Sequence, residues 1–124
     1  MLFDFKILNV SHSTAISGTS LQGYITENYA TLVEVFGEPT YSEPSGDDKV
    51  NTEWSLKFEV REEGERESRT VVATIYDWKE SSADVARSAI NHRWHIGGTS
   101  NDAVDVVTQA IEAKITLWAN QCIV

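Results

Sequence analysis

Hydrophobic and polar residues follow two different periods along this chain, and the clearest is a period of two. From Trp54 to Val60 apolar and polar residues alternate strictly, which is typical of a strand with one buried face and one wet face. The charged run over 62–67 then predicts a hairpin tip. The β-branched residues of 69–78 predict the strand that returns from it.

Two segments instead place apolar residues three and four positions apart, as a helix does. The first helix is expected from about Glu27 to Phe36, with Thr26 as its N-terminal cap and Gly37 as its left-handed end. The second is expected from Asn101 to near Asn120. Both patterns give one apolar stripe per helix, so each helix should pack against a sheet.

The remaining segments complete an α+β pattern. Residues 2–10 and 91–96 are predicted strands, whereas 11–23 and 39–49 are predicted loops and 79–89 is either a loop or one helical turn. The resulting order, β-α-β-β-β-α, predicts a single layer of about four mostly antiparallel strands with two helices on one face. A length of 124 residues fits one domain over 1–124.

Charge and cysteine content restrict the class of protein. Nineteen acidic residues against ten basic ones give a formal charge of −9, which argues against direct binding of nucleic acid and permits a basic protein partner. Solubility alone would also explain this charge. The single cysteine, Cys122, rules out an internal disulfide, and neither a signal-like segment nor a membrane span is present. A cytoplasmic protein is therefore expected.

The stretch Gly97-Gly98-Thr99-Ser100 lies between a predicted strand and the last predicted helix. We interpret it as a glycine turn that leaves backbone N–H groups at a helix N-terminus, where phosphate or carboxylate can bind. It lacks the spaced glycines and the lysine of nucleotide-binding fingerprints. A purely structural helix start remains the alternative.

The chain offers no recognisable catalytic set. The histidines are His12, His92 and His95, and the last two lie three apart on a predicted strand, so they should point to opposite faces and not share a zinc ion. The serines show no nucleophile-elbow pattern. We therefore predict a protein that is not an enzyme and holds no metal or cofactor, with a metal-dependent hydrolase as the least favoured alternative.

Aromatic residues are the stronger candidates for function. Buried Tyr and Trp need polar partners, so some of them should line an interface. Asp77, at the end of a predicted strand between two aromatics, is a candidate base or ligand contact, with the cap of the following turn as the alternative. We expect a partner-binding surface with acidic support from the hairpin tip, made of Tyr24, Tyr76, Asp77, Trp78, Trp94, His95, Glu62, Glu63 and Glu65.

Three short motifs carry a resemblance: a segment from Gly18 to Pro39 containing LQGYI and FGEP, the TIYDWK of 74–79 and the WHIGG of 94–98. Their order over roughly 18–110 resembles a group of small phage- and prophage-encoded proteins. The resemblance implies an accessory protein that counters host defence, as CRISPR inhibitors do.

From these observations we expect a non-enzymatic protein in the host-cell cytoplasm. It would bind and occlude a host defence protein, for example a nucleic-acid-binding effector, and a homodimer is possible. The alternative function is a small-ligand binder that sequesters a nucleotide or another anion at Gly97–Ser100.

Overall fold

The computed structural model describes residues 2, 4–13, 17–42, 49–80, 83–88 and 90–121. It confirms the α+β class, with five strands rather than about four in the described part of the chain. All neighbouring strands are antiparallel, and their order across the sheet is β1-β3-β4-β5-β2. The strands are β1 Phe5–His12, β2 Ser20–Glu27, β3 Glu53–Glu62, β4 Arg69–Tyr76 and β5 His92–Gly98. The helices are α1 Tyr29–Phe36, α2 Ala83–Ser88 and α3 Asp102–Gln121.

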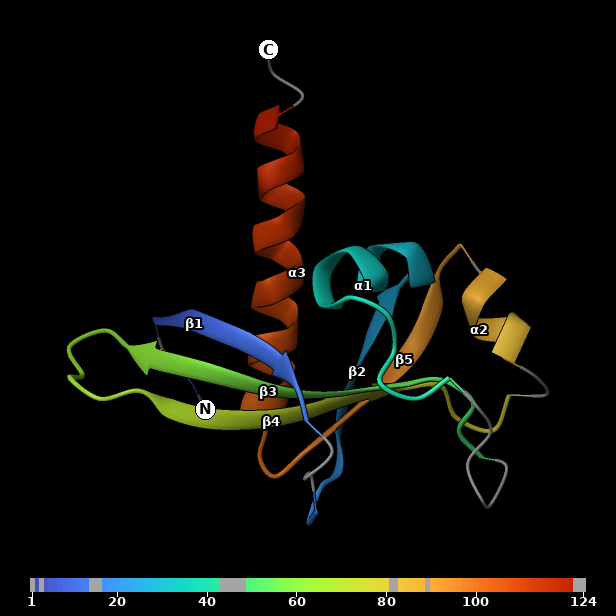
Figure 1. The fold of residues 1–124 in the computed structure, drawn as a ribbon, viewed down its shortest axis with the longest axis horizontal. Coiled ribbons are helices and arrows are strands. Elements are labelled where there is room, and N and C mark those ends of the chain that lie inside the picture. Colours follow the sequence, from blue (N-terminus) through green and yellow to red (C-terminus); the bar gives the residue numbers. More distant parts are fainter. Residues whose placement is uncertain are drawn as a thin grey trace.

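The helices α1 and α3 lie on the same face of this sheet, as predicted, while α2 lies beside α1 at the end of the sheet (Figure 1). The strands β3, β4 and β5 turn their apolar residues toward α1 and α3, which contribute Leu32, Phe36, Val106 and Val107 to the core. The opposite face of the sheet is called the outer face below. No helix in the described part of the chain is long and apolar enough to cross a membrane.

Two tryptophans form the centre of the core, one from β3 and one from β5. Trp54 and Trp94 are fully buried, and their rings meet edge to face with centroids 5.5 Å apart. Each indole N–H donates to a backbone carbonyl, that of Trp54 to Gly37 at 2.8 Å and that of Trp94 to Glu27 at 3.0 Å. Both rings are therefore buried without an unpaired donor.

Strand β2 replaces the end of the loop that the sequence predicts over 11–23, and that prediction was wrong. The strand is polar because it lies at the sheet edge, and its pairing with β5 shifts register between Leu21 and Gly23. A side chain at Gly23 would come within 2.9 Å of Val104 on α3. The core contact at Gly23 is thus made by backbone, and the apolar residues of β2 are too few to give a regular alternation, since Leu21 and Tyr24 are exposed and Ile25 packs against the core.

The first helix also begins later than predicted. Thr26 belongs to β2, and Asn28 is the N-cap, accepting the backbone N–H of Thr31 at 2.8 Å. The predicted end is confirmed: Gly37 has φ +80° and its N–H donates to Val33 at 2.7 Å. The helical turn considered for 79–89 is present as α2.

Candidate binding surface

One end of the outer face carries four rings side by side, here called the aromatic row: Tyr24, His95, Tyr76 and Trp78. Strand pairing creates it, because Tyr24 and Tyr76 both lie opposite His95, on β2 and β4 respectively. The centroid of His95 lies 4.9 Å from that of Tyr24, 5.4 Å from Tyr76 and 6.0 Å from Trp78. Tyr24 and Trp78 are exposed, at 41% and 37%.

Positively charged side chains lie against both ends of the aromatic row. The guanidinium of Arg93 is 3.8 Å from the ring centroid of Tyr24, and the ammonium groups of Lys49 and Lys79 are 5.8 and 5.7 Å from that of Trp78. Such cation–π contacts help to orient the rings. Three of the ten basic residues are thus found at one small site of a protein with a net charge of −9.

The backbone brings the two lysines together. Directly after Trp78, Lys79 adopts a left-handed conformation with φ +55°, which turns the chain back toward 49–52. Its N–H then donates to the carbonyl of Lys49 at 2.7 Å. The sequence does not indicate this pairing, because thirty positions separate the two lysines.

A pocket of about 190 Å³ lies beside the aromatic row. Its walls include Tyr76, Trp78 and Val50, and its polar groups come from Ser20, Thr74 and Glu53; Thr19 and Gly97 complete the described lining. Gly97 is part of the floor, where a side chain would collide with the hydroxyl of Thr74. Of these lining residues, Glu53 alone carries a charge.

Glu53 is an unfavourably placed carboxylate. Burial is the main cause that raises its pKa, the hydroxyl of Ser55 opposes this by donating to Oε2 at 2.9 Å, and the nearby charge of Asp77 raises the pKa further. Burial and the charge of Glu53 also raise the pKa of the Tyr76 phenol. Burial together with Arg93 lowers the pKa of His95, which favours a neutral imidazole. The site therefore combines a carboxylate acceptor with neutral rings.

Glu53→Gln is expected to stabilise the protein at neutral pH. An acid whose pKa is raised by folding lowers the free energy of unfolding as the pH rises through that pKa. Glutamine removes the charge and keeps an oxygen for Ser55. We expect a higher Tm than wild type at pH 7, and an equal Tm at about pH 3.5, below the ordinary pKa of 4.5, in calorimetric melts at both pH values. A lower Tm at pH 7 would mean that the ionised carboxylate stabilises the fold.

Two of the predicted surface residues do not lie on the surface. Trp94 is in the core, and Asp77 is fully buried. The Oδ1 atom of Asp77 accepts the backbone N–H groups of Asn51 at 2.7 Å and Thr52 at 2.9 Å. Asp77 thus holds the segment that leads from Lys49 into β3, and neither residue can contact a partner in this structure. His92 and His95 lie on opposite faces, as predicted, with His92 against Trp94 at 4.8 Å.

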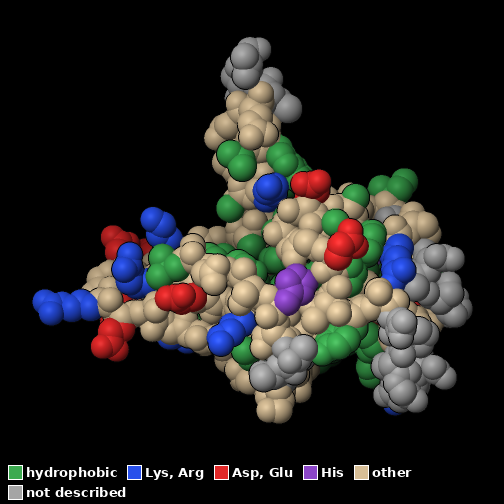
Figure 2. All heavy atoms as spheres, in the orientation of Figure 1, with side chains coloured by type: hydrophobic (Ala, Val, Ile, Leu, Met, Phe, Trp, Pro, Cys, Tyr) green, Lys and Arg blue, Asp and Glu red, His purple; other side chains and the backbone are tan. Residues whose placement is uncertain are grey.

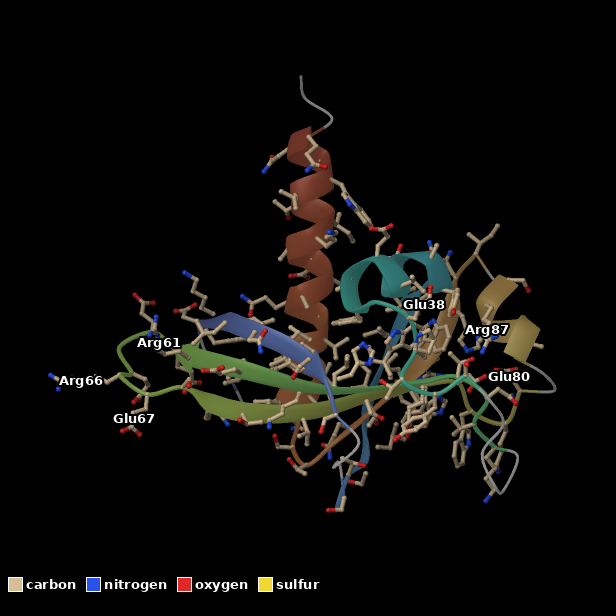
Figure 3. All side chains as sticks on the ribbon, in the orientation of Figure 1. Glu38, Arg61, Arg66, Glu67, Glu80 and Arg87 are labelled. Atoms are coloured by element: carbon tan, nitrogen blue, oxygen red, sulfur yellow. The ribbon has the colours of Figure 1, made fainter. Side chains whose placement is uncertain are left out.

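The acidic hairpin residues Glu62, Glu63 and Glu65 are far from the aromatic row. They lie at the tip of the β3–β4 hairpin, next to Arg61, Arg66 and Glu67, whereas Glu80 and Arg87 mark the opposite end of the molecule (Figure 3). The seven steps along β4 from Arg69 to Tyr76 correspond to about 23 Å. Basic and acidic side chains are also mixed around this tip (Figure 2). The predicted combination of hairpin acids and aromatics therefore does not form one contact patch.

The Gly97–Ser100 segment is not the predicted glycine turn. Gly97 and Gly98 belong to β5, and neither is among the described glycines with positive φ. At Gly98 a Cβ would lie 2.5 Å from Ala103, so this glycine permits the close start of α3. Thr99 and Ser100 then connect the strand to the helix.

The chain itself supplies the anion and several acceptors at the start of α3. Asp102 pairs with Arg69 at 3.0 Å, and its backbone N–H lies 3.3 Å from the Ser100 hydroxyl. The next two N–H groups, of Ala103 and Val104, donate to Ser100 and Asn101 carbonyls at 3.1 Å. Burial would raise the pKa of Asp102, but surrounding donors and positive charges, Arg69 among them, lower it. An external anion would compete with this carboxylate.

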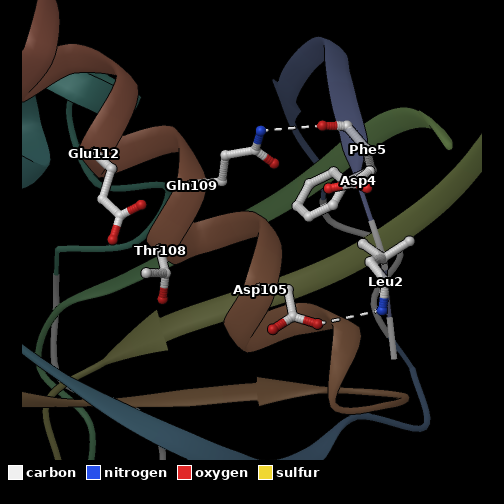
Figure 4. A pocket seen from close by; sticks show the side chains of 7 residues that line it. All are labelled: Leu2, Asp4, Phe5, Asp105, Thr108, Gln109 and Glu112. Carbon is white, nitrogen blue, oxygen red and sulfur yellow. Dashed lines mark hydrogen bonds between the residues drawn. The ribbon is translucent and has the colours of Figure 1, made fainter. Parts of the chain in front are cut away.

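A second hollow of about 410 Å³ lies between the start of β1 and α3 (Figure 4). Two hydrogen bonds connect its walls, from the Leu2 N–H to Asp105 at 3.4 Å and from Gln109 to the Phe5 carbonyl at 3.0 Å. Its other polar groups are the carboxylates of Asp4 and Glu112 and the hydroxyl of Thr108. These contacts attach the N-terminal segment to the helix, so the hollow has a structural explanation.

Among the described residues, no three His, Cys, Asp or Glu side chains are grouped as a metal site requires. Cys122 lies outside the described residues. Sequence reasoning found the four rings of the row but missed Glu53, Arg93, Lys49 and Lys79. A cross-strand alignment of the predicted strands could have placed Glu53 opposite Tyr76, whereas the lysines depend on loop conformation.

No protein-family model matches the chain, and comparisons with curated proteins and with solved structures return no significant match.

Proposed function

We propose that this chain is a non-enzymatic binding protein that occludes its target with the aromatic row and the cations beside it. The observation that carries the proposal is the row itself, because four adjoining rings lie on a sheet face opposite the helices. Exposed Tyr and Trp side chains supply much of the energy of protein–protein binding. Packing of the core does not require Tyr24 or Trp78, since both are exposed.

The proposed target is a host defence protein, in keeping with the resemblance to phage proteins. The charge of −9 would speed encounter with a target that has a basic surface, and the hairpin acids would contribute to this long-range attraction without lying in the contact. The contact itself would be made by the rings against a part of the target without basic side chains, because Arg93, Lys49 and Lys79 lie beside the row. Occlusion needs no chemical change in the target.

The other candidate function is sequestration of a small anion. Its support comes from the pocket beside Trp78 and not from the Gly97–Ser100 segment that the sequence indicates. The start of α3 is engaged by Asp102 and Ser100, whereas the pocket beside Trp78 combines rings, hydroxyls and nearby lysines. If this chain sequesters a small ligand, we therefore propose the pocket as its site.

The double variant Tyr24→Ala, Trp78→Ala tests the occlusion proposal. Cells with different defence systems would express the chain, and phage plating efficiency would be measured. Wild type is expected to block at least one system, and the double variant to lose the block because the main contact rings are gone. Trp118→Ala, in the part of α3 beyond its last buried residue Ile111, is the matched control and should behave as wild type. A double variant that still blocks, or a wild type that blocks no system, would refute the proposal.

A further inference from the structure

The pocket beside Trp78 has the size and the walls of a site for one flat ring system. Its volume is about 190 Å³, below the range of pockets for drug-sized ligands. Trp78 and Tyr76 meet edge to face with centroids 6.1 Å apart, so a ring that stacks on one would touch the edge of the other. The hydroxyl of Thr74 and the backbone of Gly97 lie at its floor.

The carboxylate in this pocket is oriented. Ser55 donates to Oε2 of Glu53 at 2.9 Å, which fixes the side chain with its second oxygen available as an acceptor. A fixed carboxylate recognises N–H groups at the edge of a base, as Asp and Glu do with the amino group of cytosine. Keeping this charge half-buried disfavours the folded state, and a ligand N–H would compensate for that cost.

The cations near the pocket suit an anion attached to that ring. Lys49 and Lys79 both approach Trp78, and Arg93 lies at the other end of the aromatic row. A second cation, such as an arginine side chain from a protein, would be repelled by the two lysines. Phosphate would instead be attracted to their ammonium groups.

From these three features we infer that the pocket binds a nucleotide, with its base against Trp78 and Tyr76, a base N–H on Glu53 and its phosphate near Lys49 and Lys79. The inference rests on the proposed function in one respect, that the outer face is the recognition surface. It adds the chemistry of the ligand: a base with an amino group should be preferred over uracil, whose one edge N–H lies between two carbonyl oxygens that a carboxylate repels. The bound nucleotide could be free or part of a single strand. The charge of −9 favours the free nucleotide, because the protein repels each further phosphate that a strand carries.

Titration calorimetry of the purified full chain tests this inference. The ligands are GMP, AMP, CMP, UMP, guanosine, inorganic phosphate, a short single-stranded oligonucleotide and an arginine-rich peptide. At least one amino-bearing mononucleotide is expected to bind saturably and more tightly than UMP, guanosine or phosphate. If the oligonucleotide binds more tightly per site than the mononucleotide, the ligand is a single strand. If it binds equally or more weakly, the ligand is a free nucleotide.

Matched variants locate the binding. Trp78→Ala should weaken nucleotide binding about tenfold, the size of one base–aromatic stack, whereas Trp118→Ala should not change it. Lys79→Ala should weaken binding of the nucleotide but not of the nucleoside. Lys114→Ala, which removes the same charge elsewhere, should change neither. Glu53→Gln should reduce the preference for amino-bearing bases. Circular dichroism would verify that each variant is folded.

Three results would overturn the inference: no saturable binding of any nucleotide up to millimolar concentration, inorganic phosphate binding as tightly as GMP, or binding of the peptide alone. The two proposals fail separately. Without nucleotide binding, a defence block that needs Tyr24 and Trp78 would leave the proposed function intact. Nucleotide binding that needs Trp78 would hold even if no defence system is blocked.

Discussion

Trp94→Ala is expected to lower the free energy of unfolding by about 3–5 kcal/mol, a large part of the stability of a single domain. The ring is fully buried, and its centroid lies 5.5 Å from that of Trp54 and 4.8 Å from that of His92. Alanine would leave a cavity between β5 and β3 that these neighbours cannot fill. It would also leave the Glu27 carbonyl without the indole donor that now lies 3.0 Å away.

Chemical denaturation measures this loss, and Tm should fall by roughly 4 °C per kcal/mol for a domain of this size. Trp78→Ala is the matched control, because Trp78 is 37% exposed and should change the unfolding free energy by less than about 1 kcal/mol. The two tryptophans thus separate stability from binding. Similar losses in both variants would contradict this assignment of roles.

The second large effect is expected for Asp77→Ala, at about 3 kcal/mol. Its Oδ1 accepts two buried N–H groups, of Asn51 and Thr52, and hydrogen bonds to charged acceptors are stronger than neutral ones. Alanine would leave both donors unpaired in the interior. Because this segment also carries Lys49 and Val50, the loss should disturb the pocket beside Trp78 as well.

Asp77→Asn is the control, since an amide keeps an oxygen at the Oδ1 position. It should retain most of the unfolding free energy and leave amide hydrogen exchange at Asn51 and Thr52 slow, whereas alanine should make that exchange fast. If both variants lose stability equally, the charge of Asp77 rather than its oxygen geometry matters. If neither does, the two hydrogen bonds contribute little to folding.

These two residues also show where prediction of the site succeeded and failed. Tyr24, Tyr76, Trp78 and His95 were expected on one surface. Strand pairing places Tyr24, Tyr76 and His95 together, and Trp78 joins them from just beyond the end of β4. Trp94 and Asp77 were expected on the same surface because each lies next to a ring of the row, Trp94 beside His95 and Asp77 between Tyr76 and Trp78, yet both are buried. Neighbouring residues of a strand point to opposite faces of the sheet. Whether a side chain reaches the surface therefore depends on the register of its strand, which the sequence did not provide.

Sequence patterns were sufficient to predict the elements that are buried through their own side chains. The alternation from Trp54 to Val60, the stripe of α3 as far as Ile111 and the stop at Gly37 are local patterns with direct physical causes, and they indicate the α+β class. Features that depend on contacts between distant segments became visible in the three-dimensional fold. Strand β2 is held by pairing with β5 and by the approach of α3 to Gly23, and Lys49 meets Trp78 through a turn at Lys79. These contacts join segments far apart in the chain, and their positions are set largely by backbone pairing, which leaves no pattern in the order of side chains.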